Sequence, residues 1–418
     1  MTLLSPASLV SDLFSGAFAG AASRSLPPRR IGAEVEFIPV EVGSGRRLAI
    51  DGKDELSTLP LLRRFGREQG WIEGLTPKGT PCFTIPTGGN ITYEPGGQLE
   101  FSSPACLTAS SLLAVLRSVV LPLRAAAAAE GIDLLAVGID PTSSIQSAPL
   151  LIQAKRYQLM ADYFETLGSS GARMMRQTAS FQINLDFDDE PWLRWRVLNA
   201  MAPFVTAIFA NSPIYAQQPT GHQSTRAAVW RTVDPSRTGL AFGEPNPVET
   251  YRDFALNAPA MLFPPVAGEY RSFAHWLTLA DPSADEWHDH LSTLFPEVRP
   301  RGHLELRSAD TLPPAWFAAP VALTAGVLYH SAALRAADAL LGTPDPALLE
   351  RAGRWGLHDP RIHEVAADLF QIALKGCRVM GEGYFHPADL EQAQAYFDLY
   401  TRRGRAPADD ILDAAIAA

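Results

Sequence analysis

The stretch from Gly89 to Pro104, GNITYEPGGQLEFSSP, places two carboxylates on β-prone sequence on either side of a tight turn. Glu94 and Glu100 flank Pro95-Gly96-Gly97. Carboxylates held in a sheet lose solvation, which raises their pKa values or destabilises the fold unless something compensates. A fold that accepts this stretch therefore needs a metal ion, an arginine or solvent at the turn.

Other segments repeat this pattern of polar residues two positions apart. Alternation of polar and apolar residues predicts strands over 29–40, 174–187 and 303–308. In 29–40, for example, Val35 and Phe37 lie on the face opposite the acids. In chain order, the same-face pairs are Glu34 and Glu36, Glu94 and Glu100, Gln182 and Asn184, and Glu305 and Arg307. Neighbouring strands of one sheet would set these pairs side by side.

The paired acids indicate a divalent cation. Two carboxylates about 4 Å apart repel by roughly 4 kcal/mol at an effective dielectric constant near 20. Oxygen ligands without Cys or His select Mg²⁺ or Mn²⁺ rather than zinc, and Mg²⁺ shared with phosphate oxygens is typical of nucleotide chemistry. For a single pair, the solvated face of a strand is the simpler explanation. Four pairs together favour the metal site, because solvated faces normally mix Lys, Thr and Ser with Glu.

The remaining segments predict one α+β domain over residues 1–418, with 314–418 as its helical C-terminal part. Arg-rich residues 221–239 form a long polar connection, and long loops in compact domains tend to be functional. The N-terminus lacks the basic region of a signal peptide, so we expect a first helix with Leu9, Leu13 and Phe14 on one face. Further helices are expected over 54–70, 110–131, 155–167, 191–211 and 287–295, and further strands over 81–86 and 133–139.

Composition excludes several classes of protein. The net charge of -10 disfavours nucleic acid as a partner, and no apolar run approaches the length of a membrane span. Three cysteines without CxxC spacing argue against a disulfide framework and structural zinc. P-loop, dinucleotide, serine-hydrolase and zincin motifs are missing from the sequence. We expect a cytoplasmic protein, a monomer or homodimer, that acts on small molecules.

Several motifs, spread from about Gly32 to Asp310, resemble those of one family. They are IGAEVEF, ITYEPGGQLEFSSPA, KRYQLMADYF, MMRQTASFQINLDF, ANSPIYAQQPTG, STRAAVWRTVDPSRTG and HLSTLFPEVRPRGHLELRSAD. In this order they resemble the motifs of glutamate-cysteine ligases of the plant and proteobacterial type, which are related to glutamine synthetase. The EPGGQLE and LELRSAD blocks are the most specific.

The resemblance implies a cupped, mainly antiparallel sheet surrounded by helices. It implies ATP-dependent condensation of the glutamate γ-carboxylate with the amino group of cysteine, in the first step of the biosynthesis of glutathione or a related thiol. The implied metal ligands are Glu34, Glu36, Glu94, Glu100 and Glu305, with Gln182 on an adjacent strand. There are two alternatives. The protein could join glutamate to another amine, or it could be a non-catalytic sensor of nucleotide or amino acid.

The basic residues receive roles within this chemistry. Arg307, beside Glu305, is expected to stabilise the transferring phosphoryl group or the tetrahedral oxyanion. Arginine binds carboxylates bidentately, so the 221–239 connection is expected to hold the glutamate α-carboxylate, and the start of the 155–167 helix to reach a nucleotide phosphate. The residues concerned are Arg226, Trp230 and Arg231 for the carboxylate, and Lys155 and Arg156 for the phosphate. Solvated surface positions are the competing interpretation for all five.

Departures from the family pattern leave the acceptor amine open. Leu306 and Ser308 stand where the family commonly has Met and Gly, and His303 stands where it has Tyr. The cysteines do not resemble the pairs used for redox control in plant enzymes.

Overall fold

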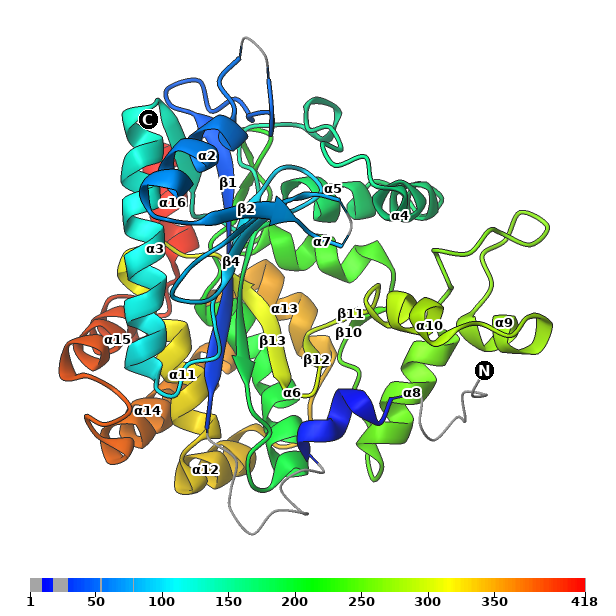
Figure 1. Ribbon diagram of the computed structural model, residues 1–418. Coiled ribbons are helices and arrows are strands. Elements are labelled where there is room, and N and C mark those ends of the chain that lie inside the picture. Colours follow the sequence, from blue (N-terminus) through cyan, green and yellow to red (C-terminus); the bar gives the residue numbers. More distant parts are fainter. Residues whose placement is uncertain (1–9, 18–28, 53–54, 78, 418) are drawn as a thin grey trace.

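The computed structural model describes residues 10–17, 29–52, 55–77 and 79–417 (Figure 1). Within this part of the chain a nine-stranded sheet has the strand order β12-β13-β7-β1-β5-β4-β3-β2, and β6 also pairs with β1. Every pairing in it is antiparallel. The strands of this sheet are β1 (Ile31–Glu41), β2 (Ile72–Leu75), β3 (Pro81–Thr84), β4 (Asn90–Tyr93), β5 (Leu99–Ser102), β6 (Ile132–Leu135), β7 (Ser180–Leu185), β12 (Val298–Pro300) and β13 (Leu304–Asp310).

Helices surround the sheet, which confirms the predicted fold class. Two short pairs, β8 (Ile214–Tyr215) with β9 (Gln218–Pro219) and β10 (Thr238–Gly239) with β11 (Phe295–Pro296), lie outside it. The α-helices are α2 (Thr58–Glu68), α3 (Ala109–Ala129), α4 (Lys155–Glu165), α5 (Ser170–Gln177), α6 (Pro191–Ile208), α7 (Thr225–Val233), α8 (Pro247–Asn257), α9 (Phe273–Leu279), α10 (Ala284–Leu291), α11 (Ala318–Leu328), α12 (Ser331–Leu341), α13 (Ala347–Trp355), α14 (Pro360–Met380), α15 (Pro387–Leu399) and α16 (Pro407–Ala417).

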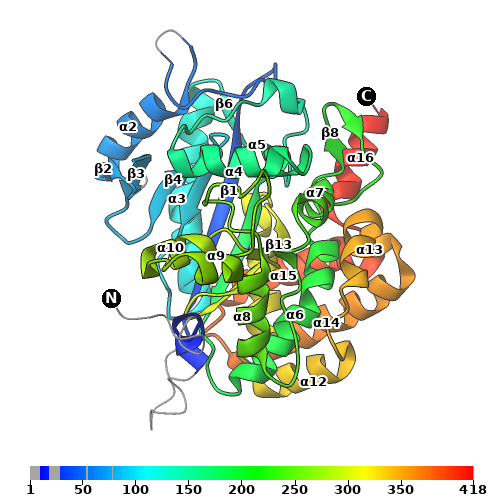
Figure 2. The ribbon, with the colours of Figure 1, turned by 90° about the vertical axis from the view of Figure 1, so that its right-hand side faces the viewer.

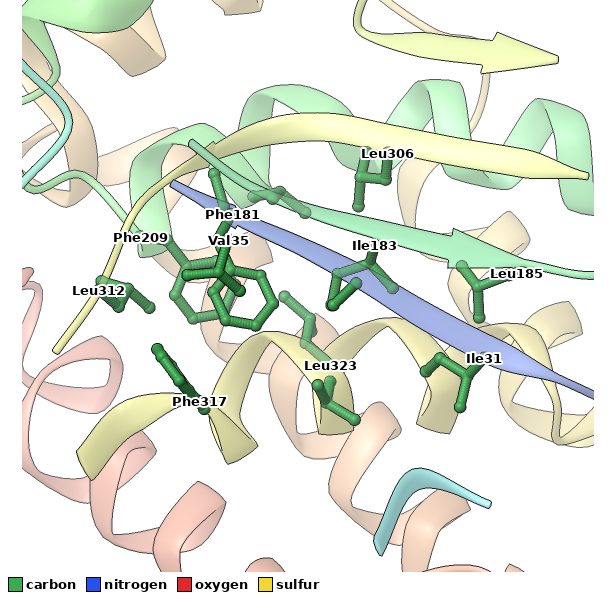
Figure 3. Close-up of a cluster of buried hydrophobic side chains, with 14 of the residues drawn as sticks. Ile31, Val35, Phe181, Ile183, Leu185, Phe209, Leu306, Leu312, Phe317 and Leu323 are labelled. Carbon is green, nitrogen blue, oxygen red and sulfur yellow. The ribbon is translucent and has the colours of Figure 1, made fainter. Parts of the chain in front are cut away.

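One face of the sheet is apolar and carries the core. Successive strand residues point to opposite faces, so Ile31 and Val35 of β1 share a face with Phe181 and Ile183 of β7. These side chains are at most 1% exposed and pack against Leu323 and its neighbours on α11 (Figure 3). Fully burying such a side chain contributes about 1.5–3 kcal/mol each. The same hydrophobic cluster includes residues from both sides of position 314.

The other face of the sheet is polar and is overhung by helices rather than covered by them. α4, α5, α7, α8 and α10 stand around it in Figure 2, whereas α3, α11, α14 and α15 lie on the opposite side of the sheet, at the left in Figure 1. This arrangement leaves a cavity between the polar face and the overhanging helices.

α3 qualifies the expectation that no segment approaches the length of a membrane span. Its 21 residues are long and apolar enough to cross a bilayer, with a mean hydropathy of 1.7 over the best window. Leu112, Leu116 and Leu123 of α3 are buried, and the helix packs against β1 and β6. α3 thus contributes to the core of this fold.

Four predicted elements were wrong in type or extent, among them the strand expected over 133–139, which ends at Leu135 as β6. Residues 174–187 are one helix and one strand, because Gly171, Met174 and Met175 follow helical spacing and bury one side of α5 before β7 begins. The supposed connection 221–239 contains α7, whose N-cap, Ser224, accepts a hydrogen bond from the Ala227 N–H. α10 begins earlier than predicted, at a capping box formed by Ser283 and Glu286.

The N-terminal part differs slightly from the prediction, and the C-terminal part agrees with it. Of the expected first helix, Asp12–Phe14 is a 3₁₀ helix that buries Phe14, and Leu9 lies outside the described residues, as does Asp54 at the expected start of α2. The described residues after Pro314 are helical apart from short connections, as predicted.

Candidate active site

The sheet register brings the predicted acids together on the polar face. Glu36 on β1 lies directly opposite Glu100 on β5, and Glu34 lies opposite Gln182 on β7. On the other side of β7, Glu305 of β13 is paired with Asn184. The same-face pairs predicted from alternation therefore form one row across four neighbouring strands, β5, β1, β7 and β13, and Glu94 follows directly after the end of β4.

The Pro95-Gly96-Gly97 turn joins β4 to β5 and aims Glu94 and Glu100 into this row. Gly97 has a φ of +84°, which favours glycine, and a Cβ on Gly96 would lie 2.2 Å from the Arg176 carbonyl oxygen. The buried Arg47 guanidinium donates to the Gly96 carbonyl at 2.5 Å. Both glycines are thus required, one for its conformation and the other for a close backbone approach.

A cavity of about 450 Å³ lies over the row. Its walls include predicted residues from strands, from the turn and from two helices: Glu34, Glu36, Glu94, Glu100, Gln182, Arg156, Arg226, Trp230 and Arg307. The walls also include side chains that the sequence did not point to, among them Tyr157, Ser180, Tyr251, His288, Arg299 and Arg301.

Glu305 lies beneath the cavity and holds three arginines. Its carboxylate is completely buried and accepts from Arg299 at 2.6 and 3.0 Å, from Arg301 at 3.2 Å and from Arg307 at 3.1 Å. Burial alone would raise the pKa of Glu305, but Arg299 and then Arg307 outweigh it and hold that pKa well below its usual range. In this arrangement Glu305 organises positive charge, and its predicted role as a metal ligand stays a prediction.

Arg299 was missed in the sequence although a signal for it existed. The segment VRPRGHLELR reads as a hairpin turning at Gly302, and such a hairpin sets Arg299 opposite Glu305, as the structure has it. The same hairpin places Arg301 at the turn itself, near Glu305.

A chain of hydrogen bonds connects the arginines to the acids. Arg307 donates to the Gln182 Oε1 at 2.5 Å, and the Gln182 Nε2 donates to Glu36 at 3.2 Å. Glu36 also accepts from the backbone N–H and the hydroxyl of Ser180, at 2.8 and 2.9 Å. A β-bulge between Leu306 and Ala309 interrupts β13 where Arg307 stands, and bulges commonly re-aim side chains beside active sites.

The acidic part of the cavity carries more negative charge than its surroundings neutralise. Burial, and then the charges of three neighbouring glutamates, raise the pKa of Glu100 well above its usual range. Those neighbours are Glu34, Glu94 and Glu36. Burial likewise raises the pKa of Glu34 and of Glu36. A cation placed here would relieve these carboxylates, and their all-oxygen donor set suits Mg²⁺ or Mn²⁺.

The carboxylates fit a metal ion that takes only some of its ligands from the protein. Among the described residues, no three His, Cys, Asp or Glu side chains are arranged so that they could hold a metal ion by themselves. Mg²⁺ usually completes its shell with water and substrate phosphate oxygens, so an incomplete protein shell agrees with a nucleotide-dependent site.

The predicted basic residues divide into two groups. Arg226 and Arg307 flank the Trp230 ring, with guanidinium carbons 5.9 and 5.7 Å from its centroid, and all three line the cavity. Arg231, on the same helix, points elsewhere: it donates to Glu297 at 2.6 Å and fastens α7 to the β11–β12 segment. It is not among the cavity-lining residues.

The start of α4 divides in the same way. Arg156 lines the cavity and pairs with Asp289 of α10 at 3.5 Å. Lys155 is solvent-exposed and does not line the cavity. Only Arg156 of this pair is placed to meet a ligand inside.

None of the three departures from the family pattern, Leu306, Ser308 and His303, lines the cavity. Leu306 is on the apolar face of β13, as Figure 3 shows. The buried Ser308 hydroxyl donates to Glu297 at 2.6 Å. The three cysteines are free thiols.

The sequence and fold match known proteins. The model of glutamate-cysteine ligase family 2 (GCS2) matches residues 30–417. The glutamate-cysteine ligase EgtA of Mycolicibacterium smegmatis is 34% identical over 352 residues, 80% of this chain and 79% of that protein. The chloroplastic glutamate-cysteine ligase of Arabidopsis thaliana is 31% identical over 410 residues, 92% of this chain and 76% of that protein.

A solved glutamate-cysteine ligase of Francisella tularensis, in complex with AMP, shares the fold with a TM-score of 0.55 at 13% identity, covering 93% of this chain and 84% of that one. The matches confirm the resemblance seen in the motifs and the ligase activity that it implies, and they favour neither another acceptor amine nor a non-catalytic sensor. The chain belongs to glutamate-cysteine ligase family 2.

Proposed function

We propose that this chain joins glutamate to cysteine in the cavity over the acidic row, with ATP as co-substrate. The observation that carries the proposal is the division of one cavity into a carboxylate side and an arginine side, linked through Gln182. The arginines can stabilise the negative charge that develops during acyl and phosphoryl transfer, while the carboxylates can hold a cation.

The reaction has two balanced steps. An oxygen of the glutamate γ-carboxylate attacks the γ-phosphorus of ATP, and ADP leaves. The cysteine amino group then attacks the acyl carbon, the amide bond forms, phosphate leaves and the amine loses a proton. Such chemistry is accelerated mainly by positioning and by electrostatic stabilisation.

The residues of the cavity supply both effects. The Nη1 of Arg307 donates to Gln182 and Glu305, whereas its Nε and Nη2 donate to no described residue. These groups can donate to the transferring phosphoryl group or to the tetrahedral oxyanion. Arg226, beside Trp230, holds the α-carboxylate of glutamate, and Arg156 meets a phosphate.

Mg²⁺, or Mn²⁺, is the proposed cofactor and would supply charge neutralisation between the phosphates and the carboxylates. Glu34, Glu36, Glu94 and Glu100 would hold it, with Gln182 beside them in the cavity lining. Glu305, the remaining predicted ligand, already accepts from three arginines and is the least accessible of the set. We also propose that residues 1–418 form a single catalytic domain and that the protein is cytoplasmic, a monomer or homodimer that binds neither nucleic acid nor membrane. Its product would enter the biosynthesis of glutathione or a related thiol.

Phosphate release from ATP tests the reaction. Release should require glutamate and increase with cysteine, whereas other amino acids should give little. Increase with a different amine only would overturn the choice of acceptor. No release, with nucleotide still bound, would overturn catalysis.

The acidic row has its own test. Glu94→Ala and Glu100→Ala should weaken Mg²⁺-dependent nucleotide binding, because each removes a carboxylate from the cavity. Glu391→Ala, an exposed glutamate on α15, serves as the control and should bind normally. Unchanged binding in the first two variants would refute the metal site.

A further inference from the structure

Asp310, the last residue of β13, is a buried acid with three donors aimed at it. It is 1% exposed and does not line the cavity. The Asn211 N–H and the Ser212 hydroxyl donate to its Oδ2 at 2.8 and 2.6 Å, and the Ser224 hydroxyl donates to its Oδ1 at 2.9 Å. Burying an aspartate costs stability unless hydrogen bonds satisfy its carboxylate, and these three hydrogen bonds also fix the position of that carboxylate.

The packing around Asp310 leaves no freedom. A Cβ on Gly138 would lie 2.3 Å from the Asp310 carboxyl carbon, so the carboxylate rests directly against the glycine backbone. The Gly138 N–H in turn donates to the Asn211 carbonyl at 3.0 Å. The carboxylate cannot shift toward this side.

Two of the contacts of Asp310 fix the first turn of α7. Ser224 donates to Asp310 while its own oxygen accepts from the Ala227 N–H at 3.0 Å as the N-cap of the helix. Arg226 Nη1 lies 3.8 Å from Asp310 Oδ1, and Arg226 Nη2 donates to the Arg307 carbonyl at 2.7 Å. The cap orients the helix, and the carboxylate attracts its guanidinium toward β13.

We propose that Asp310 is a positioning residue that holds Arg226, through the Ser224 cap and its own charge, at the distance from Arg307 that glutamate binding requires. The inference rests on the proposed function, in which Arg226 holds the substrate α-carboxylate. β13 would then serve the site twice, with Arg307 in the cavity and Asp310 behind the opposite arginine.

Asp310→Asn tests this inference because the amide keeps the size of the side chain but replaces one acceptor oxygen with a donor. We expect KM for glutamate to rise by about tenfold to a hundredfold, as for a displaced binding group, with KM for ATP changed by less than about twofold. Arg226→Lys should have a similar effect. The double variant should be little worse than the worse single one, because both changes remove one function.

Asp389→Asn is the matched structural control. Asp389 is also buried, accepts from Arg117 at 2.6 Å and from Ser110 at 2.7 Å, and joins α15 to α3 away from the cavity. It should lower the melting temperature without changing either KM. If Asp310→Asn behaves like this control, or if its effect adds fully to that of Arg226→Lys, the positioning role is overturned.

Amide hydrogen exchange gives a readout that does not need turnover. Asp310→Asn should speed exchange over residues 225–231 of α7 and leave α4 unchanged, whereas Asp389→Asn should leave both unchanged. Unchanged exchange over α7 overturns the inference whatever the substrate. If Asp310→Asn speeds exchange over α7 but the wild-type protein releases no phosphate with glutamate, Asp310 still orders α7 and the proposed function is refuted.

Discussion

Arg299 and Arg301 offer a direct measure of how burial sets the strength of an ion pair, because both pair with the same carboxylate. Arg299 is 13% exposed and makes two bonds to Glu305, whereas Arg301 is 50% exposed and makes one. Breaking a buried pair costs about 3–5 kcal/mol, and losing an exposed one about 0–1 kcal/mol. Since Arg307 stays beside Glu305, we expect about 3 kcal/mol for Arg299→Met and under about 1 kcal/mol for Arg301→Met.

Urea denaturation followed by tryptophan fluorescence measures both losses, with refolding by dilution to establish reversibility. Measurements at acid pH add a second check. Because the pKa of Glu305 is lower in the folded protein than the unfolded value of about 4.3, its ion pairs stabilise the fold above that pH, and this stabilisation is lost as the pH falls below it. The gap between wild type and Arg299→Met should therefore narrow below about pH 4. Equal losses for the two arginines at pH 7 would refute the reasoning.

Three further predictions concern the turn, the acidic row and a buried histidine. Gly97→Ala should lower stability by about 1–2 kcal/mol in urea denaturation because of its positive φ, and should raise the Mg²⁺ concentration needed for activity. Glu100→Gln should raise the melting temperature in EDTA, because it removes one of the crowded charges, while weakening nucleotide binding with Mg²⁺; a lower melting temperature would contradict this. Burial lowers the pKa of His290 to about 3, so the fold is stabilised above the unfolded pKa of about 6.5 and loses about 1.4 kcal/mol per pH unit below it. In His290→Gln this slope should disappear from urea denaturation between pH 6 and 4.

The strand faces could be predicted because they depend on local geometry. Alternation placed Glu34 and Glu36 on one face and Val35 on the other, and β1 has this arrangement. The helices of the overhanging wall were harder to predict. α7 was interpreted as a loop because its polar composition masked the Ser224 cap, and only its packing against α5 and α13 makes the helix stable.

The roles of basic residues could not be read from residue type. Arg226 and Arg231 are on one helix and look alike in the sequence, yet one lines the cavity and the other binds Glu297. Lys155 and Arg156 differ in the same way, because adjacent helical residues point in directions about 100° apart.

The sequence by itself determined that acids and apolar residues occupy opposite faces of strands, since the period of two belongs to the backbone. It also determined the glycine turn between Glu94 and Glu100 and the family motifs. Only the tertiary structure decided which strands are neighbours and in what register, and hence that Glu36 faces Glu100 and that three arginines meet at Glu305. Strand pairing joins segments far apart in the chain, and it is selected by the packing of the whole apolar face against the helices behind it rather than by any local pattern.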